Sequence, residues 1–96
     1  MLTHIVCWKY RPDVTEEDRA KHVDMLLSLP GLISEIESLS VGRDILHLDR
    51  SFYTGLVSTF ADKAALDRYT EHPEHQKVIE FGRSITQQAV SVDFTE

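Results

Sequence analysis

The chain has 96 residues, enough for one domain around one hydrophobic core, and we expect residues 1–96 to form it. Its formal net charge is −6 without any cluster of Lys or Arg, which argues against binding to nucleic acid or to an anionic membrane surface. Since there is no apolar run of membrane-spanning length, no signal-peptide pattern and only one cysteine, we expect a cytoplasmic protein without disulfides.

The chain opens with a segment whose two faces are both partly apolar. Within residues 2–10, His4, Val6 and Trp8 fall on one face by alternation, and Ile5 falls on the other. Such a pattern is typical of a strand that is covered on both sides. We therefore expect a buried first strand over this segment.

A helix and two strands are expected next. Residues 16–29 carry apolar side chains at helical spacing behind Thr15, a suitable N-cap, and they begin with acids that suit a helix N-terminus. Residues 36–45 predict a second strand, in which Gly42 indicates a bulge or bend. Residues 52–60 are rich in aromatic and β-branched side chains and predict a third strand.

The last third of the chain predicts two helices and a strand. A short helix behind an Asp62 cap ends near Glu71, a second runs from Pro73 to about Thr86, and a strand covers residues 88–94. The resulting order, β-α-β-β-α-α-β, predicts an α+β fold of the ferredoxin-like, split βαβ kind with a four-stranded antiparallel sheet.

A sheet of this kind has helices on one face and leaves the other face open. On that second face the alternation places Ile5 and Cys7 of the first strand and Val57 of the third. An exposed apolar sheet face calls for a partner, and the simplest partner is a second copy packed sheet to sheet about a two-fold axis. We therefore expect a homodimer through the open sheet face, with Cys7 as a buried and inert thiol.

The two final helices meet at a corner that carries polar side chains, residues 69–76, which we call the helix corner. Pro73 disfavours α geometry at the preceding His72 and fits the first position of the next helix, so we expect His72 to be the N-cap of that helix. Tyr69 precedes the break, and His75 falls in the first turn after it.

Over essentially its whole length the chain resembles the stress-responsive dimeric α/β-barrel (Dabb) family. The most specific match is Tyr69-x-x-His72-Pro73-x-His75, and the softer matches are His4-Ile5-Val6, Val41-Gly42-Arg43, residues 52–60 and Val92-Asp93-Phe94. The resemblance implies a ferredoxin-like protomer whose sheet pairs with that of a second copy to form a dimeric barrel.

One member of that family is the plant polyketide cyclase that forms olivetolic acid by an intramolecular aldol condensation without metal or organic cofactor. Similarity to this enzyme implies that Tyr69 and His75 are the catalytic pair. It also implies a substrate pocket, lined here by His4, Val6, Trp8, His22, Leu26, Leu56 and Val78. The chain departs from the cyclase in its larger Trp8, in the polar His22 and in Thr54, which replaces a pocket histidine.

Each polar candidate has a functional and a structural interpretation. The helix N-terminus favours a neutral His75, which could act as a general base or simply bond to the backbone of the corner. Tyr69 could donate to a carbonyl oxygen or be an amphipathic core tyrosine. His4 could be a polar group of the pocket or a satisfied histidine of the core.

The histidines also raise the question of a metal site. His72 and His75 could face one ion, with His4 as a third ligand. However, no cysteine or carboxylate completes a recognisable ligand spacing. We therefore expect neither a metal nor another cofactor.

Two functions of different classes fit these observations. The first is a cofactor-independent enzyme of the aldol, cyclase or isomerase type that acts on an apolar carbonyl compound, with a cofactor-free monooxygenase on the same barrel as a variant. The second is a non-enzymatic, stress-associated dimer that binds a small apolar ligand or acts by its assembly alone. The enzyme needs an open cavity, so it fails if Trp8 and Phe81 fill the space between sheet and helices.

Overall fold

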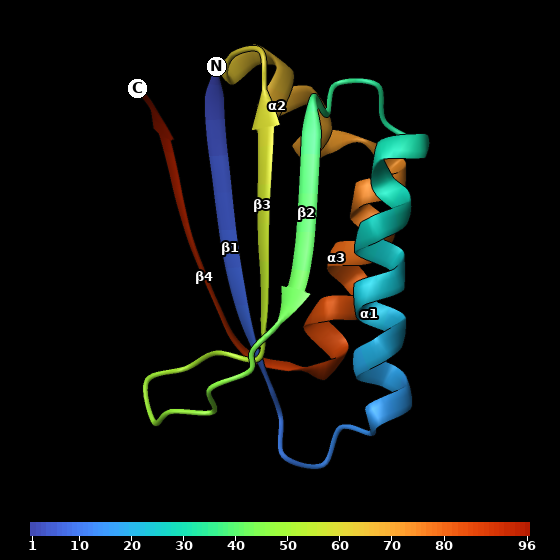
Figure 1. The fold of residues 1–96 in the computed structure, drawn as a ribbon. Coiled ribbons are helices and arrows are strands. Elements are labelled where there is room, and N and C mark those ends of the chain that lie inside the picture. Colours follow the sequence, from blue (N-terminus) through green and yellow to red (C-terminus); the bar gives the residue numbers. More distant parts are fainter.

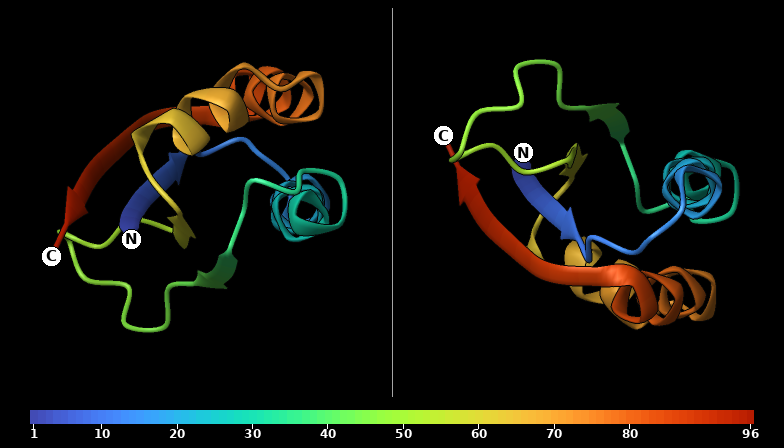
Figure 2. Two further views of the ribbon diagram at one scale, coloured as in Figure 1. Left: turned by 90° about the horizontal axis from the view of Figure 1, so that it is seen from above. Right: turned by 90° about the horizontal axis from the view of Figure 1, so that it is seen from below.

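A computed structural model describes all 96 residues and shows one curved sheet with helices on one side (Figures 1 and 2). The elements follow the predicted order, with a short 3-10 turn η1 after the first helix: β1 (Leu2–Tyr10), α1 (Glu16–Ser28), η1 (Leu29–Gly31), β2 (Ser38–Arg43), β3 (Thr54–Phe60), α2 (Lys63–Glu71), α3 (Pro73–Ile85) and β4 (Thr86–Thr95). The four strands pair antiparallel in the order β2-β3-β1-β4. The predicted ferredoxin-like fold class is therefore confirmed.

The helices begin where the sequence places capping side chains. Thr15 Oγ1 accepts a hydrogen bond from the backbone N–H of Asp18 at 3.1 Å, and Asp62 Oδ1 accepts one from the N–H of Ala65 at 2.9 Å. Each bond satisfies one of the N–H groups that a helix start leaves unpaired. No helix in the structure combines the length and the apolar character that crossing a membrane requires.

The expected ends of β2 and β3 were wrong. Residues 36–45 were expected as a strand, but Ile36 packs in the core before β2 starts, and Ile45 is 85% exposed in the loop after it. This loop spans residues 44–53 and takes the first two residues of the expected third strand. Gly42 makes no bulge, because it pairs with Gly55 in unbroken register.

The expected last strand was too short. β4 starts two residues earlier than residues 88–94, because Thr86 directly follows the last helical residue and already pairs with Tyr10. The only irregularity in the ladder lies between Lys9 and Tyr10 at this end of β1.

The core lies between the helices and one face of the sheet. β3 shows the alternation clearly: Leu56 and Phe60 are buried against the helices, whereas Val57 between them is 45% exposed. Burying a side chain of this size contributes about 1.5–3 kcal/mol. Leu29, just beyond α1, is also fully buried, so the 3-10 turn extends the apolar side of that helix.

The opposite side of the sheet, which we call the outer face, carries no helix (Figure 1). It collects apolar side chains from three strands: Ile5, Cys7, Val57, Val90, Val92 and Phe94. The three from β4 are between 38% and 53% exposed. An open apolar face was predicted from the alternation of β1 and β3, and β4 enlarges it.

Candidate functional site

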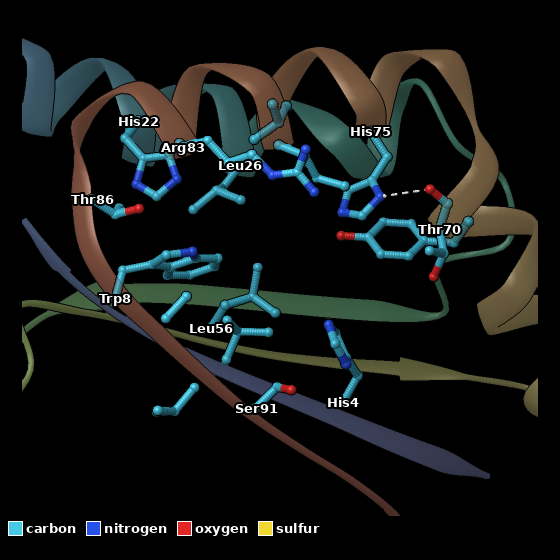
Figure 3. Close-up of a pocket in the computed structure, with 17 residues that line it drawn as sticks. His4, Trp8, His22, Leu26, Leu56, Thr70, His75, Arg83, Thr86 and Ser91 are labelled. Carbon is cyan, nitrogen blue, oxygen red and sulfur yellow. Dashed lines mark hydrogen bonds between the residues drawn. The ribbon is translucent and has the colours of Figure 1, made fainter.

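A cavity of about 330 Å³ opens between α1 and α3 on one side and β1, β3 and β4 on the other (Figure 3). Its size lies at the lower end of the range for small-molecule sites. The nine residues predicted for a site all lie on its wall: His4, Val6, Trp8, His22, Leu26, Leu56, Tyr69, His75 and Val78.

Trp8 forms part of the wall and leaves the cavity open. Its ring stands edge-on to His22, with 5.0 Å between ring centroids. Phe81 also packs beside His22, at 6.4 Å, but it does not line the cavity. The arrangement that would have excluded an enzyme, in which Trp8 and Phe81 fill the space, is therefore absent.

The helix corner fixes the orientation of His75. α2 ends at Glu71, so the carbonyl oxygen of Thr70 has no partner within its helix. It accepts one hydrogen bond from His75 Nδ1 at 3.2 Å (Figure 3) and another from Gln76 Nε2 at 2.7 Å. A carbonyl oxygen can only accept, so the proton of neutral His75 sits on Nδ1. Its Nε2 then carries the free electron pair.

Burial favours the neutral form of His75. Desolvation lowers the pKa of His75, the bond to the Thr70 carbonyl raises it, and the nearby His4 and His72 lower it further. An imidazole that stays unprotonated near neutral pH is able to take a proton from a substrate.

Tyr69 provides a hydroxyl group next to this base. Its ring packs on that of His75, with 4.0 Å between centroids and 31° between planes. Burial raises the pKa of Tyr69 to about 12, so the phenol keeps its proton. The hydroxyl has no hydrogen-bond partner in the protein, yet no buried polar atom is left unpaired, so it opens into the cavity.

His4 brings a third polar group, backed by a carboxylate. Its Nδ1 contacts Asp93 Oδ1 across the β1–β4 ladder, where the two residues are direct partners. A carboxylate in this position holds the ring and fixes the proton on Nδ1. The ring of His4 also packs edge-on against Tyr69 at 6.3 Å.

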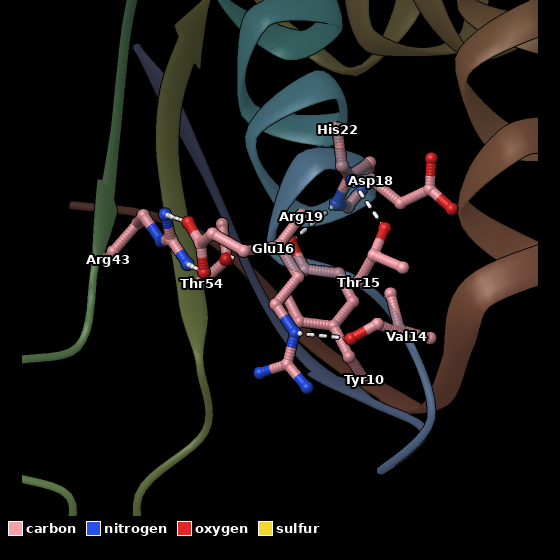
Figure 4. Close-up of polar contacts among 9 residues, drawn as sticks. All are labelled: Tyr10, Val14, Thr15, Glu16, Asp18, Arg19, His22, Arg43 and Thr54. Carbon is pink, nitrogen blue, oxygen red and sulfur yellow. Dashed lines mark hydrogen bonds and ion pairs between the residues drawn. The ribbon is translucent and has the colours of Figure 1, made fainter.

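A buried chain of polar groups lies at the other end of the cavity. The Tyr10 hydroxyl lies 2.8 Å from His22 Nδ1 and 2.8 Å from Thr54 Oγ1, which joins β1, α1 and β3 (Figure 4). Desolvation lowers the pKa of His22 to about 4. His22 Nε2 has no bond within the protein, and since no buried polar atom is unpaired, it faces the cavity.

His72 has the structural role that was predicted for it. Its side chain accepts a hydrogen bond from the backbone N–H of Glu74 at 3.1 Å and so caps α3. This bond turns His72 toward the backbone rather than toward His4 and His75. No three side chains of His, Cys, Asp or Glu are grouped so that they could hold a metal ion.

Among the residues of the site that were not singled out from the sequence, three bear on its chemistry: Asp93, Thr70 and Arg83. Asp93 faces His4 only through the strand register, which the sequence does not fix. Thr70 acts through its backbone carbonyl, so its side chain gives no signal. Arg83, on the wall beside His22 (Figure 3), could have been found, because it lies four and eight residues after Ile79 and His75 on one side of α3.

Comparisons with known proteins agree with this fold. The family model described as Stress responsive A/B Barrel Domain matches residues 2–96. A dimeric protein of unknown function and ferredoxin-like fold from Bacteroides fragilis is 25% identical, with a TM-score of 0.86 over 99% of this chain and 95% of that chain. None of the curated proteins matches the chain.

Two further solved structures share the fold at lower identity. A Dabb family protein from Mesorhizobium loti is 18% identical, with a TM-score of 0.82 over 99% of this chain and 95% of that one. A hydroxynitrile lyase from Passiflora edulis is also 18% identical, with a TM-score of 0.87 over 97% of this chain and 90% of that one. At this identity the likeness shows the architecture alone.

Proposed function

We propose, starting from the fact that the chain belongs to the stress-responsive A/B barrel (Dabb) family, that it is a cofactor-independent enzyme acting on a small apolar carbonyl compound. One observation carries this proposal: the ring of His75 packs on that of Tyr69, and both line the same cavity. A base with a free electron pair thus lies beside a phenol that keeps its proton.

The proposed reaction begins with removal of a proton from the carbon next to the carbonyl group. His75 Nε2 takes the proton, and the electron pair of the broken C–H bond moves toward the carbonyl oxygen to form an enolate. Tyr69 donates a hydrogen bond to that oxygen and stabilises the developing charge. In an aldol cyclisation the nucleophilic carbon then adds to a second carbonyl of the same molecule, and the new alkoxide oxygen takes the proton back from His75. In an isomerisation His75 returns the proton to a different atom of the delocalised anion.

The rest of the wall supports this chemistry. Leu26, Leu56 and Val78 are almost fully buried and exclude water from the apolar body of a ligand. His4, held by Asp93, adds a polar group on the sheet side. The Passiflora edulis neighbour is described as a hydroxynitrile lyase, so this architecture is compatible with enzymatic catalysis of that kind.

The test is the exchange of substrate protons for deuterium, followed by proton NMR in D₂O. Acetophenone and 1-phenylbutane-1,3-dione serve as probes because their acidic protons lie next to a carbonyl. We expect exchange above the buffer rate, lost in His75→Ala and slowed about 10- to 100-fold in Tyr69→Phe. His47→Ala is the control, because it removes an exposed histidine in the loop after β2 that does not line the cavity.

Ligand-induced thermal shifts on the same proteins separate the alternatives. Stabilisation by the probes without exchange would show a binding protein and overturn the enzyme. Neither a shift nor exchange with either probe would overturn both binding and catalysis of such compounds.

We also propose that the protein is a homodimer through the outer face. Val90, Val92 and Phe94 leave an apolar strip there that water disfavours, and the Bacteroides fragilis neighbour is described as dimeric. Sedimentation should give about twice the protomer mass of 11.0 kDa. Val92→Asp should shift the protein toward the protomer, and a wild-type protein that sediments as one protomer would refute the dimer.

A further inference from the structure

The cavity differs in charge from the rest of the molecule. The chain has 16 acidic and 10 basic residues, yet none of the 17 residues that line the cavity is Asp or Glu. Its wall contains three histidines and one arginine, Arg83. The cavity wall therefore carries no carboxylate, although the protein as a whole is acidic.

Arg83 is also free of partners. Of the ten basic residues, five make ion pairs with acids and three others rest on aromatic rings. Only Arg50, in the loop after β2, and Arg83 have neither an ion pair, a hydrogen bond nor an aromatic contact. Glu80, one turn before Arg83 on α3, makes no ion pair with it.

Arg83 lies on the same cavity wall as the proposed reactive pair, Tyr69 and His75. Figure 3 shows its guanidinium group on the helix side of the cavity, between His22 and His75. Thr86 follows one turn later on the same wall and adds a hydroxyl. On the sheet side, the carboxylate of Asp93 is already engaged with His4.

We propose that the compound bound in this cavity carries a carboxylate, which Arg83 holds, in addition to its carbonyl group. This inference rests on the proposed function and narrows its substrate class to apolar oxo acids. A guanidinium group is planar and binds a carboxylate through two parallel hydrogen bonds, so it selects this group over a neutral one. With the carboxylate at Arg83, the apolar body lies along Trp8 and the carbonyl reaches Tyr69.

The size of the cavity agrees with such a ligand. A volume of about 330 Å³ suits one ring with a short chain rather than a long polymer. A compound of this size has few apolar contacts, so one charged anchor contributes a large share of its affinity and sets its direction in the cavity.

The test compares an oxo acid with its neutral amide by isothermal titration calorimetry. The probes are 4-oxo-4-phenylbutanoate and 4-oxo-4-phenylbutanamide, which share the aryl ketone and differ only in the terminal group, a charged carboxylate or a neutral amide. We expect the acid to bind wild-type protein about tenfold more tightly than the amide. In Arg83→Gln this ratio should fall to about one with unchanged affinity for the amide, and Arg83→Lys should restore part of it.

Arg50→Gln is the matched control. It removes the other unpaired arginine, which does not line the cavity, and it should leave the ratio of the two affinities unchanged. Equal affinities of acid and amide for the wild type, or a ratio that survives Arg83→Gln, would overturn the inference. In that case binding and proton exchange of the amide would still support the proposed function. Binding of neither compound would also overturn the inference, and the exchange measured on acetophenone then decides separately on the function.

Discussion

His22 should make the protein less stable in mild acid. Its imidazole is 1% exposed, and burial lowers its pKa to about 4 from the usual 6.5. Below pH 6.5 the unfolded chain therefore binds a proton that the folded chain does not bind until about pH 4. Stability is unaffected above this window and is lost as the pH falls through it.

The size of the effect follows from the two pKa values. Over the whole window it amounts to about 3 kcal/mol, and between pH 7 and pH 5 to about 2 kcal/mol. A domain of this size has a free energy of unfolding of only about 5–15 kcal/mol, so the loss is easily measured.

The perturbation is His22→Phe, which keeps an aromatic ring among Trp8, Leu26 and Phe81 but cannot be protonated. It should cost about 1 kcal/mol at pH 7 for the lost bond to Tyr10, and it should remove about 2 kcal/mol of the loss between pH 7 and pH 5. His75 also has a lowered pKa and weakens both proteins in acid, so its contribution cancels in the comparison.

Urea unfolding at pH 7 and pH 5, followed by the fluorescence of the single tryptophan, measures this difference at one fixed protein concentration. His47→Gln is the control, because that side chain is exposed and should leave the acid sensitivity unchanged. If His22→Phe loses as much stability as the wild type between the two pH values, His22 is not the source of the acid sensitivity.

Three other features of the structure can each be tested by substitution. Tyr10→Phe leaves two buried partners unpaired and should cost about 2–3 kcal/mol in urea unfolding, against about 1 for Thr54→Val; equal costs would contradict the buried chain. Gly82→Ala gains up to about 1 kcal/mol of helix propensity. Its methyl group would lie 3.3 Å from His22 Nε2, so the melting temperature should hold while 1-phenylbutane-1,3-dione binds more weakly; unchanged binding would argue against an open Nε2. His72→Ala removes the cap of α3 and should cost about 1 kcal/mol in thermal unfolding. No change would show that the hydrogen bond from the Glu74 N–H to His72 does not stabilise the protein.

The element order was predictable because each element carries its own local signals. Asp62 and the pair His72–Pro73 mark helix ends by chemistry within one turn, and both predictions are confirmed. Strand ends are different, because they depend on which residues of another strand lie opposite. Phe52 is of a residue type that favours strands, but the pairing of β2 with β3 ends at Arg43 and Thr54, so Phe52 lies in the loop 44–53.

The site was predictable to the same extent. The helix corner brings Tyr69 and His75 together through local geometry, so their contact follows from the sequence pattern around Pro73. The pair His4–Asp93 joins the two ends of the chain and depends on the register of β1 and β4. The hydrogen bonds of Tyr10 to His22 and Thr54 require β1, α1 and β3 to meet at one point, which no local sequence pattern can indicate.

The position of the Tyr10 hydroxyl has a consequence for what the cavity can accept. It carries one proton and can donate it either to His22 or to Thr54. In the first case the cavity-facing nitrogen of the imidazole bears a hydrogen and donates to a ketone; in the second it is bare and accepts from an alcohol. A rotation of two hydroxyl groups and a shift of one proton thus reverse the polarity of the wall without creating charge, so one cavity can hold both a carbonyl compound and the hydroxy compound formed from it.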